Sequence, residues 1–427
     1  MNVFFIIILV ALIVAFALEL VANRLNLKAL KLEVPPALKG VYNAEDYRKS
    51  QEYIRATTRF GLVGSTLMLF LLLAFWFSGG FNYFDQVVRA WGFVPVVSGL
   101  FYIGILLLAY GLLMLPFIIY GTFVIEERFG FNRTTAHTFF LDRVKGLGLA
   151  LLLGGSLLIG ILALFEYAGP YAWLYCWAAV VTFSLAMQYV APTWIMPLFN
   201  KFVPIESGEL KEAILRYARS VNFPIKNVLV MDGSRRSSKS NAFFTGFGRN
   251  KRIALFDTLI EKHNVPEIVA VLAHEIGHYK KKHILQGVII GILHTGVIFF
   301  LLSLFLGSPG LYQAFYMTQP SIYAGLLFFG LLYTPIELVL SIALQMISRR
   351  NEYEADRFAA ETVDEPSRLV DALKKLFATN LSNLTPHPFY VFISYSHPPL
   401  LHRVEAIEEL KRKLRGQAAE KVWFNRE

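Results

Sequence analysis

The chain has 427 residues, of which 55% are hydrophobic and only 17% are charged, a balance typical of an integral membrane protein. The formal net charge of +10 suits a protein that faces anionic lipid headgroups, and the absence of any groove-reading motif argues against nucleic acid as a partner. The single cysteine, Cys176, allows no intramolecular disulfide and no cysteine-based metal site.

The first predicted element is an apolar helix at residues 1–22. Its apolar run is too long for a signal peptide, lacks a basic start and shows no clear small-residue cleavage site, so we expect a retained transmembrane helix. Further segments are long enough to cross about 30 Å of hydrocarbon. They raise the predicted number of spans to seven and cover 61–78, 97–124, 147–166, 171–193, 285–306 and 321–347.

Lysine and arginine alternate between the loops that join these spans. The loops 23–60 and 125–146 are basic, whereas 79–96 contains a single arginine. Because basic short loops remain on the cytoplasmic side of a membrane, the alternation places the N-terminus outside. The two polar blocks, 194–284 and 348–427, are then predicted to face the cytoplasm together.

The first polar block is predicted to contain an amphipathic helix and a small sheet. Residues 207–220 repeat apolar side chains at helical spacing. Three β-prone runs follow at 227–231, 241–247 and 251–257, separated by glycine-containing turns. We expect these strands to form a sheet beside the next helix.

That next helix is predicted to begin at Asn264. Asn264 and Glu267 have the spacing of a capping box, and Pro266 is tolerated in a first turn. We expect the helix to continue through the lysines at 280–282, which would reach the headgroup layer, into the apolar span from 285. Side chains on this helix should therefore lie near the membrane surface.

The same helix contains a His-Glu-x-x-His motif. His274 and His278 are one helical turn apart, so both imidazoles can bind one tetrahedral zinc ion. Glu275 lies beside them and is predicted to accept the proton of a water that the metal acidifies. Other histidines, including His263 and His283, are predicted to lie at the surface or the membrane interface.

A catalytic zinc needs a third protein ligand, and the sequence NEYEAD after the last span supplies a candidate. We predict Glu352 as this ligand and Asp356, four residues on, as the acceptor for the free N–H of a ligand histidine. Glu354 points roughly 200° away from Glu352 on a helix and is the weaker candidate. The alternative interpretation of Glu352 and Asp356 is an exposed, charged helix segment.

These motifs lie within longer segments that resemble the CAAX prenyl protease type 1 family of membrane zinc endopeptidases. The resemblance covers most of residues 120–410. Its segments include FVIEERFGFN, PLFNKFVPIESGEL, DGSRRSSKSNAFFTGFGRNKRIALFDTLI and YSHPPLLHRVEAI. It implies a mainly α-helical integral-membrane fold, in which seven transmembrane helices enclose a chamber and a small α+β zinc-metalloprotease domain lies on the cytoplasmic side.

The resemblance also assigns roles to residues outside the zinc motif. His397 would line the cleft and stabilise the oxyanion of the tetrahedral intermediate. Arg403 would orient the site or bind a substrate carbonyl. Asn241, Ala242 and Phe243 would form an edge strand that aligns an extended substrate. Without the resemblance, we would interpret His397 as a turn cap, Arg403 as a solvated side chain and residues 241–243 as an ordinary strand.

We divide the chain into four predicted parts. Residues 1–200 hold five transmembrane helices, and 201–284 form the cytoplasmic zinc-protease segment with its small sheet and HEIGH helix. Residues 285–347 hold transmembrane helices six and seven. The C-terminal segment, 348–427, is cytoplasmic and completes the active site.

The predicted function is hydrolysis of peptide bonds near the membrane surface, with one Zn²⁺ per chain and with a peptide or protein substrate and membrane lipids as partners. The resemblance implies removal of the C-terminal tripeptide from peptides prenylated at a C-terminal Cys-a-a-X sequence. The alternatives are a quality-control metalloprotease for membrane proteins, a non-catalytic lipid- or peptide-binding chamber with structural zinc, and a protease that cuts within the bilayer. The short connection 307–320 and the lack of a C-terminal dilysine signal favour a bacterial inner membrane over the endoplasmic reticulum.

Overall fold

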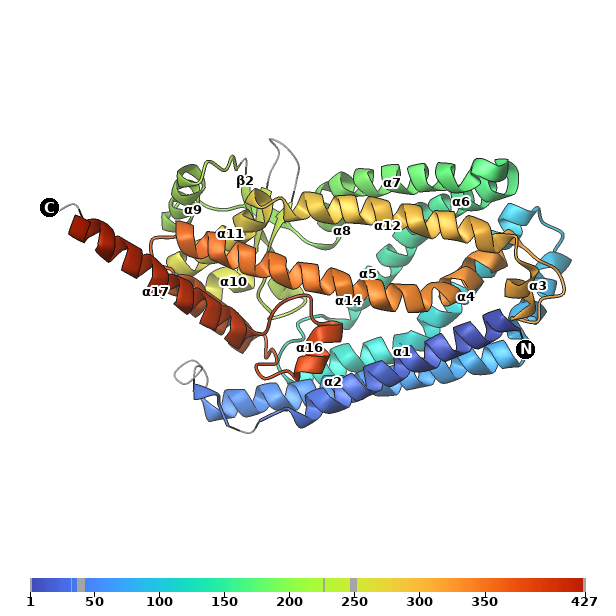
Figure 1. Cartoon of the computed structure of the whole chain (residues 1–427), viewed down its shortest axis with the longest axis horizontal. Coiled ribbons are helices and arrows are strands. Elements are labelled where there is room, and N and C mark those ends of the chain that lie inside the picture. The colour runs from blue at the N-terminus through green and yellow to red at the C-terminus, as the bar shows by residue number, and fades with distance from the viewer. Residues whose placement is uncertain (1, 32, 37–42, 226, 246–251, 425–427) are drawn as a thin grey trace.

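The computed structural model describes residues 2–31, 33–36, 43–225, 227–245 and 252–424. Long helices run along the molecule, and a small sheet with several shorter helices lies at one end (Figure 1). The N-terminus lies at the opposite end from this sheet, and the C-terminus lies on the sheet side (Figure 1). Both polar blocks of the sequence therefore gather at one end of the helices.

Seven helical segments in the described part of the chain are long and apolar enough to cross a membrane, as the sequence predicts. Three of them contain π-helical turns, η2 (Gly121–Glu126), η3 (Ala150–Gly155) and η5 (Ala191–Ile195). The helices are α1 (Val3–Lys28), α2 (Ala44–Phe77), α4 (Pro95–Tyr120), α5 (Ala136–Leu149) joined to α6 (Ser156–Tyr167), α7 (Ala172–Val190), α12 (His283–Leu306) and α14 (Ile322–Thr362).

The helix α14 differs from its predicted span in a way that matters for the site. It continues past residue 347, the predicted end, to Thr362 without a break. No proline or glycine interrupts residues 348–362, and Ala355, Ala359 and Ala360 are buried there. The carboxylates of NEYEAD are therefore carried on an extension of a membrane-spanning helix.

An apolar core stabilises each end of the molecule. At the end near the N-terminus, Trp76, Phe315 and Phe328 pack with the short helices α3 (Gly80–Ala90) and α13 (Pro309–Gln313). At the other end, a core packs α11 (Val265–Lys280) against α9 (Glu209–Ser220), α14, α15 (Ser367–Thr379) and α17 (Leu400–Phe424). The second core fixes the helices that carry the predicted metal ligands.

In the described part of the chain, the sheet has four strands in the order β1-β2-β4-β3. Three of them correspond to the predicted strands, β2 (Asn227–Met231), β3 (Ala242–Thr245) and β4 (Arg252–Phe256). Residues 246–247, at the end of the strand predicted for β3, and residue 251, at the start of the strand predicted for β4, lie outside the described residues. Strand β1 (Phe202–Pro204) was not predicted, because three residues ending in a proline give no alternating pattern. Strands β2 and β4 are parallel, and both outer pairs are antiparallel.

Three further short helices complete this end. α8 (Met196–Phe199) leads from the fifth span into β1, and α10 (Asp257–Lys262) leads from β4 into α11. α16 (Pro388–Ser394) lies between α15 and α17 along the chain and packs against α14 and α1. The predicted helix in 207–220 is α9, and its residues Ile214, Tyr217 and Ala218 are buried as its apolar spacing requires.

The helix α11 begins as predicted and ends earlier than predicted. Asn264 and Glu267 form the capping box. The expected continuation through residues 280–282 is wrong, because α11 ends at Lys280 and Lys282 takes a left-handed conformation with φ of 61°. A new helix, α12, then begins at His283.

Candidate active site

Helix α11 lies against α14, and three side chains from these two helices converge between them. His274 and His278 come from α11, and Glu352 comes from α14, with one ligand atom of each lying within 4.8 Å of the others. The two Nε2 atoms are 3.1 Å apart. The carboxylate oxygens of Glu352 lie 3.4 Å from Nε2 of His274 and 3.3 Å from Nε2 of His278.

This donor set fits a divalent metal ion. The Nδ1 atoms of His274 and His278 contact other side chains, so the two Nε2 atoms are the ones that face each other. Oε2 of Glu352 is buried and makes no hydrogen bond among the described residues. Converging lone pairs on two imidazoles and a carboxylate repel unless a proton or a metal cation lies between them. Two histidines and a glutamate also leave a fourth position for water or substrate.

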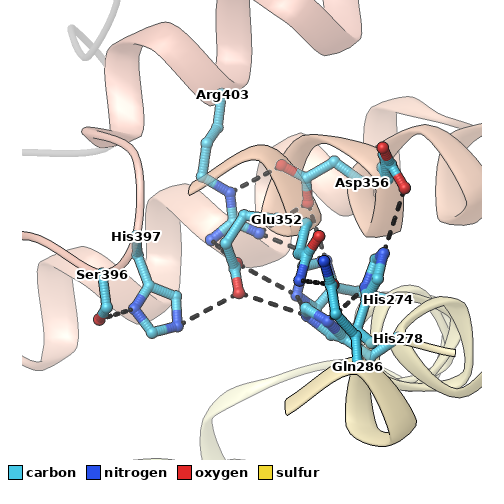
Figure 2. Close-up of polar contacts among 11 residues, drawn as sticks. His274, His278, Gln286, Glu352, Asp356, Ser396, His397 and Arg403 are labelled. Atoms are coloured by element: carbon cyan, nitrogen blue, oxygen red, sulfur yellow. Dashed lines mark hydrogen bonds and ion pairs between the residues drawn. The ribbon is translucent and has the colours of Figure 1, made fainter. Parts of the chain in front are cut away.

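Asp356 and Arg403 form a buried pair behind the predicted ligands (Figure 2). Oδ1 of Asp356 lies 2.9 Å from Nδ1 of His274. Arg403, on α17, donates from Nε to Oδ2 of Asp356 at 2.7 Å and from Nη2 to Oδ1 at 2.6 Å. Nη1 of Arg403 also lies 3.4 Å from Oε2 of Glu352. These contacts favour the orienting role of Arg403 over direct contact with a substrate carbonyl.

His397 lies beside Glu352, on the side away from His274 (Figure 2). Its Nε2 is 3.4 Å from Oε1 of Glu352, while its side chain remains 62% exposed. Its Nδ1 is 2.9 Å from the hydroxyl oxygen of Ser396. A histidine that is exposed on one side and faces the ligand cluster on the other is accessible to a bound peptide.

Glu275 borders a cavity of about 570 Å³ together with His278 and Phe243. Burial raises the pKa of the Glu275 carboxyl above its ordinary value, and the adjacent His274 and His278 oppose that shift. Phe243 belongs to β3, so the cavity joins the edge strand to the motif helix.

The same cavity continues between α12 and α14, where His294, Leu344 and Ile347 line it. His294 contacts the hydroxyl of Tyr333 at 3.1 Å and a carboxylate oxygen of Glu337 at 3.4 Å. The cavity therefore connects the ligand cluster with the membrane-spanning part of the molecule. The larger enclosed chamber that the resemblance implies stays a prediction.

The prediction that His263 and His283 lie at the surface or the membrane interface is wrong, because both side chains are buried within the protein. His263 lies between α10 and α11, with its Nδ1 3.1 Å from a carboxylate oxygen of Glu267. His283 is only 9% exposed and contacts Nδ1 of His278. The break at Lys282 turns His283 back toward α11, and a break of that kind has no glycine or proline signal in the sequence.

Asn380 supports the predicted edge strand, although no sequence pattern indicates this role. Its side-chain amide accepts a hydrogen bond from the backbone N–H of Ser240 at 3.0 Å and donates one to the carbonyl of Ser240 at 3.1 Å. Asn380 follows α15, far along the chain from the strand that it contacts. The two bonds anchor the chain directly before Asn241 and β3.

Comparison with known proteins identifies the family. A profile described as CAAX prenyl protease N-terminal, five membrane helices, matches residues 23–201, and the profile of peptidase family M48 matches residues 204–411. The CAAX prenyl protease 1 homolog of Arabidopsis thaliana is 37% identical over 406 residues, covering 93% of this chain and 95% of the relative. CAAX prenyl protease 1 of Saccharomyces cerevisiae is 35% identical over 416 residues, covering 90% and 91%.

A solved structure supports the same assignment. The crystal structure of S. mikatae Ste24p matches with a TM-score of 0.90 at 34% identity, covering 95% of this chain and 99% of that chain. The similarity therefore extends over the membrane helices, the sheet and the ligand cluster together. This chain belongs to the CAAX prenyl protease 1 family of M48 peptidases and is an integral, multi-pass membrane metalloendopeptidase.

Proposed function

We propose that one zinc ion per chain is held by His274, His278 and Glu352 and that the chain uses it to hydrolyse peptide bonds near the membrane surface. The observation that carries this proposal is the convergence of the three ligand atoms within 4.8 Å, with a buried carboxylate oxygen that lacks a hydrogen bond among the described residues. A ligand set of two histidines and one glutamate is typical of catalytic zinc, which keeps an open fourth position. This set argues against a purely structural zinc closed by four protein ligands.

Glu275 acts as the general base in this proposal. A bound zinc ion supplies Lewis acidity, which polarises the substrate carbonyl and acidifies a water molecule. The Glu275 carboxylate accepts the proton from that water and delivers it to the leaving amide nitrogen. Its position beside the two histidines and at the wall of the cavity supports this role.

His397 stabilises the negative charge that develops on the substrate oxygen. When the Ser396 hydroxyl donates to Nδ1 of a neutral His397, the ring proton lies on Nε2, the atom that faces Glu352. An N–H donor at this place lowers the energy of the tetrahedral intermediate. Arg403 acts through Asp356 and Glu352, whose side chains it holds.

Strand β3 aligns the substrate. Its inner edge pairs with β4, and no strand among the described residues pairs with its outer edge, which supports main-chain hydrogen bonding to an extended peptide there. Asn241, Ala242 and Phe243 are the residues that would make this contact. The Phe243 side chain lies at the cavity that Glu275 also lines, which places an aligned peptide beside the ligand cluster.

The substrate class that we propose is a peptide with a prenylated C-terminal Cys-a-a-X sequence, cut to release the last three residues. The relatives from Arabidopsis thaliana and Saccharomyces cerevisiae are named CAAX prenyl proteases. The cavity continues from the ligand cluster to Leu344 and Ile347 on a membrane-spanning helix, an apolar surface suited to a lipid chain. General degradation of membrane proteins is the second candidate.

We further propose that the sheet end faces the cytoplasm. The lysine- and arginine-rich blocks lie at that end, and basic segments remain on the cytoplasmic side. The host membrane that the sequence favours is a bacterial inner membrane, with the endoplasmic reticulum as the alternative. Localisation of the tagged chain in its native cell distinguishes the two.

Glu275→Gln tests the mechanism, because it preserves shape and removes the base. We expect the purified variant to bind one zinc ion as tightly as the wild type and to lose turnover of a farnesylated Cys-a-a-X peptide. Unchanged turnover with intact protein would eliminate Glu275 as the base. Glu361→Gln, which changes an exposed carboxylate on α14, is the control and should leave the rate unchanged.

A pair of substrates tests the lipid specificity separately. A farnesylated peptide and its unprenylated twin are compared under identical conditions. Preferential cleavage of the farnesylated peptide supports prenyl recognition. Equal rates would instead support the quality-control function, while leaving the hydrolytic mechanism intact.

A further inference from the structure

A hydrogen-bonded row of three side chains runs from the predicted metal ligand His278 to the surface of α14. Nδ1 of His278 lies 3.0 Å from Nδ1 of His283. Nε2 of His283 lies 3.2 Å from Oε2 of Glu354. Glu354 in turn accepts a hydrogen bond from Nε of Arg350 at 3.0 Å. The His283 ring is nearly fully buried between the other two, with 7% of its side chain exposed.

The geometry of this hydrogen-bonded row depends on the break between α11 and α12. Residues five apart on a continuous helix are separated by about 140° around the axis, so His278 and His283 would not meet on one. Lys282 takes a left-handed φ of 61°, and α12 starts in a new direction at His283. This turn brings the His283 ring onto that of His278, with ring centroids 5.1 Å apart.

The direction of each hydrogen bond follows from the ligand role of His278. If Nε2 of His278 binds a metal, its ring proton lies on Nδ1 and is donated to Nδ1 of His283. His283 then carries its own proton on Nε2 and donates it to the Glu354 carboxylate. Every donor in this hydrogen-bonded row has one acceptor, so the row has a single consistent arrangement of protons.

We propose that His283 and Glu354 are positioning residues of the metal site, which hold the His278 ring in the tautomer and orientation that bind the metal. This inference rests on the proposed ligand set. It gives each ligand histidine its own carboxylate: Asp356 supports His274 directly, and Glu354 supports His278 through His283. A carboxylate behind a ligand imidazole raises the basicity of that imidazole and strengthens the metal bond.

The test is the zinc affinity of purified variants, measured by competition with a chelator. His283→Ala removes the acceptor for His278 and is expected to weaken zinc binding about 10- to 100-fold. His283→Gln keeps an amide that can accept from His278 and donate to Glu354, and should restore part of the affinity. Glu354→Gln alters a partly exposed side chain, so we expect the variant to fold and to weaken binding less than His283→Ala.

The matched control is Glu361→Gln. Glu361 pairs with Arg357 on the same helix with the same four-residue spacing as Glu354 with Arg350, but it contacts no histidine among the described residues. We expect this control to bind zinc as the wild type does. Thermal unfolding without metal is measured for every variant, because a role limited to stability would lower the unfolding temperature and leave rescue by glutamine without effect.

A second readout is the visible spectrum of the cobalt-substituted protein, which reports on the geometry of the ligand set. His283→Ala is expected to alter this spectrum, and Glu361→Gln is expected to leave it unchanged. Wild-type zinc affinity in folded His283→Ala and Glu354→Gln would overturn the positioning role while leaving the proposed zinc site intact. If the wild-type chain itself binds no zinc, the proposed function fails first.

Discussion

The backbone of Gly277 lies directly against the backbone of Ala355. A β carbon at Gly277 would be 3.0 Å from the carbonyl oxygen of Ala355 and 3.1 Å from its α carbon. Gly277 lies between the two histidines of the motif, and Ala355 lies between Glu352 and Asp356. The absence of a side chain at Gly277 therefore sets the distance between the two helices that supply the ligands.

Gly277→Ala is expected to push α11 away from α14. The two nearest obstructing atoms are backbone atoms, which do not move aside as a flexible side chain would, so overpacking should cost about 1–3 kcal/mol. Zinc affinity should fall because the distance from Glu352 to the two imidazoles increases. Thermal unfolding and chelator competition measure the two effects. The control is Gly330→Ala on α14, where an added β carbon meets no atom within 4 Å; equal behaviour of both variants would contradict this role of Gly277.

Arg403→Met should destabilise the protein, because the buried Asp356 carboxylate loses its guanidinium partner and keeps only its contact with His274. Arg403 is 4% exposed and Asp356 is 2% exposed, and loss of one partner from such a buried pair costs about 3–5 kcal/mol. The double variant Asp356→Asn, Arg403→Met removes both charges and should lose less than the sum of the single variants. Thermal unfolding of the four proteins gives the coupling energy. Strict additivity would show that the pair does not act as a unit.

Zinc binding should be coupled to proton release from His274. Burial by itself lowers the pKa of His274, but hydrogen bonds to Asp356 and Glu352 outweigh this effect and raise the pKa to about 9 in the metal-free protein. A protonated imidazole cannot bind the metal, so below that pKa the ion must displace a proton. The apparent affinity should therefore fall about tenfold for each pH unit below it.

Chelator competition at several pH values, together with calorimetry in buffers of different protonation enthalpy, measures this coupling. The expected result is an affinity that rises with pH and then levels off as His274 becomes neutral without metal. An affinity independent of pH from neutral to mildly alkaline conditions would show that His274 is already unprotonated before the metal binds.

Asn380→Ala should weaken substrate alignment without affecting the metal. The variant loses both hydrogen bonds to Ser240, each worth about 0.5–1.5 kcal/mol, and frees the chain before β3. We expect the KM for a peptide to rise roughly tenfold, with a smaller change in kcat. Zinc affinity serves as the internal control and should stay at the wild-type value. A fall in kcat with unchanged KM would assign Asn380 a different role.

Much of the fold was predictable because its signals are local. The apolar runs are long enough for seven spans, and the Asn264–Glu267 capping box marks the start of α11. Helical periodicity alone puts His274 and His278 on one face of that helix. Each of these properties depends on residues within a few turns of one another, so the sequence by itself determines them.

Which helix faces pack against each other depends on the tertiary structure. Glu352 lies more than 70 residues from His278, and only the packing of α11 on α14, at Gly277 and Ala355, brings their side chains within reach. The burial of His283 follows from a left-handed turn at Lys282, a lysine that gives no local turn signal. Long-range packing selects such a turn through the contacts that the turn creates. Those contacts cannot be inferred from the spacing of residues along the sequence.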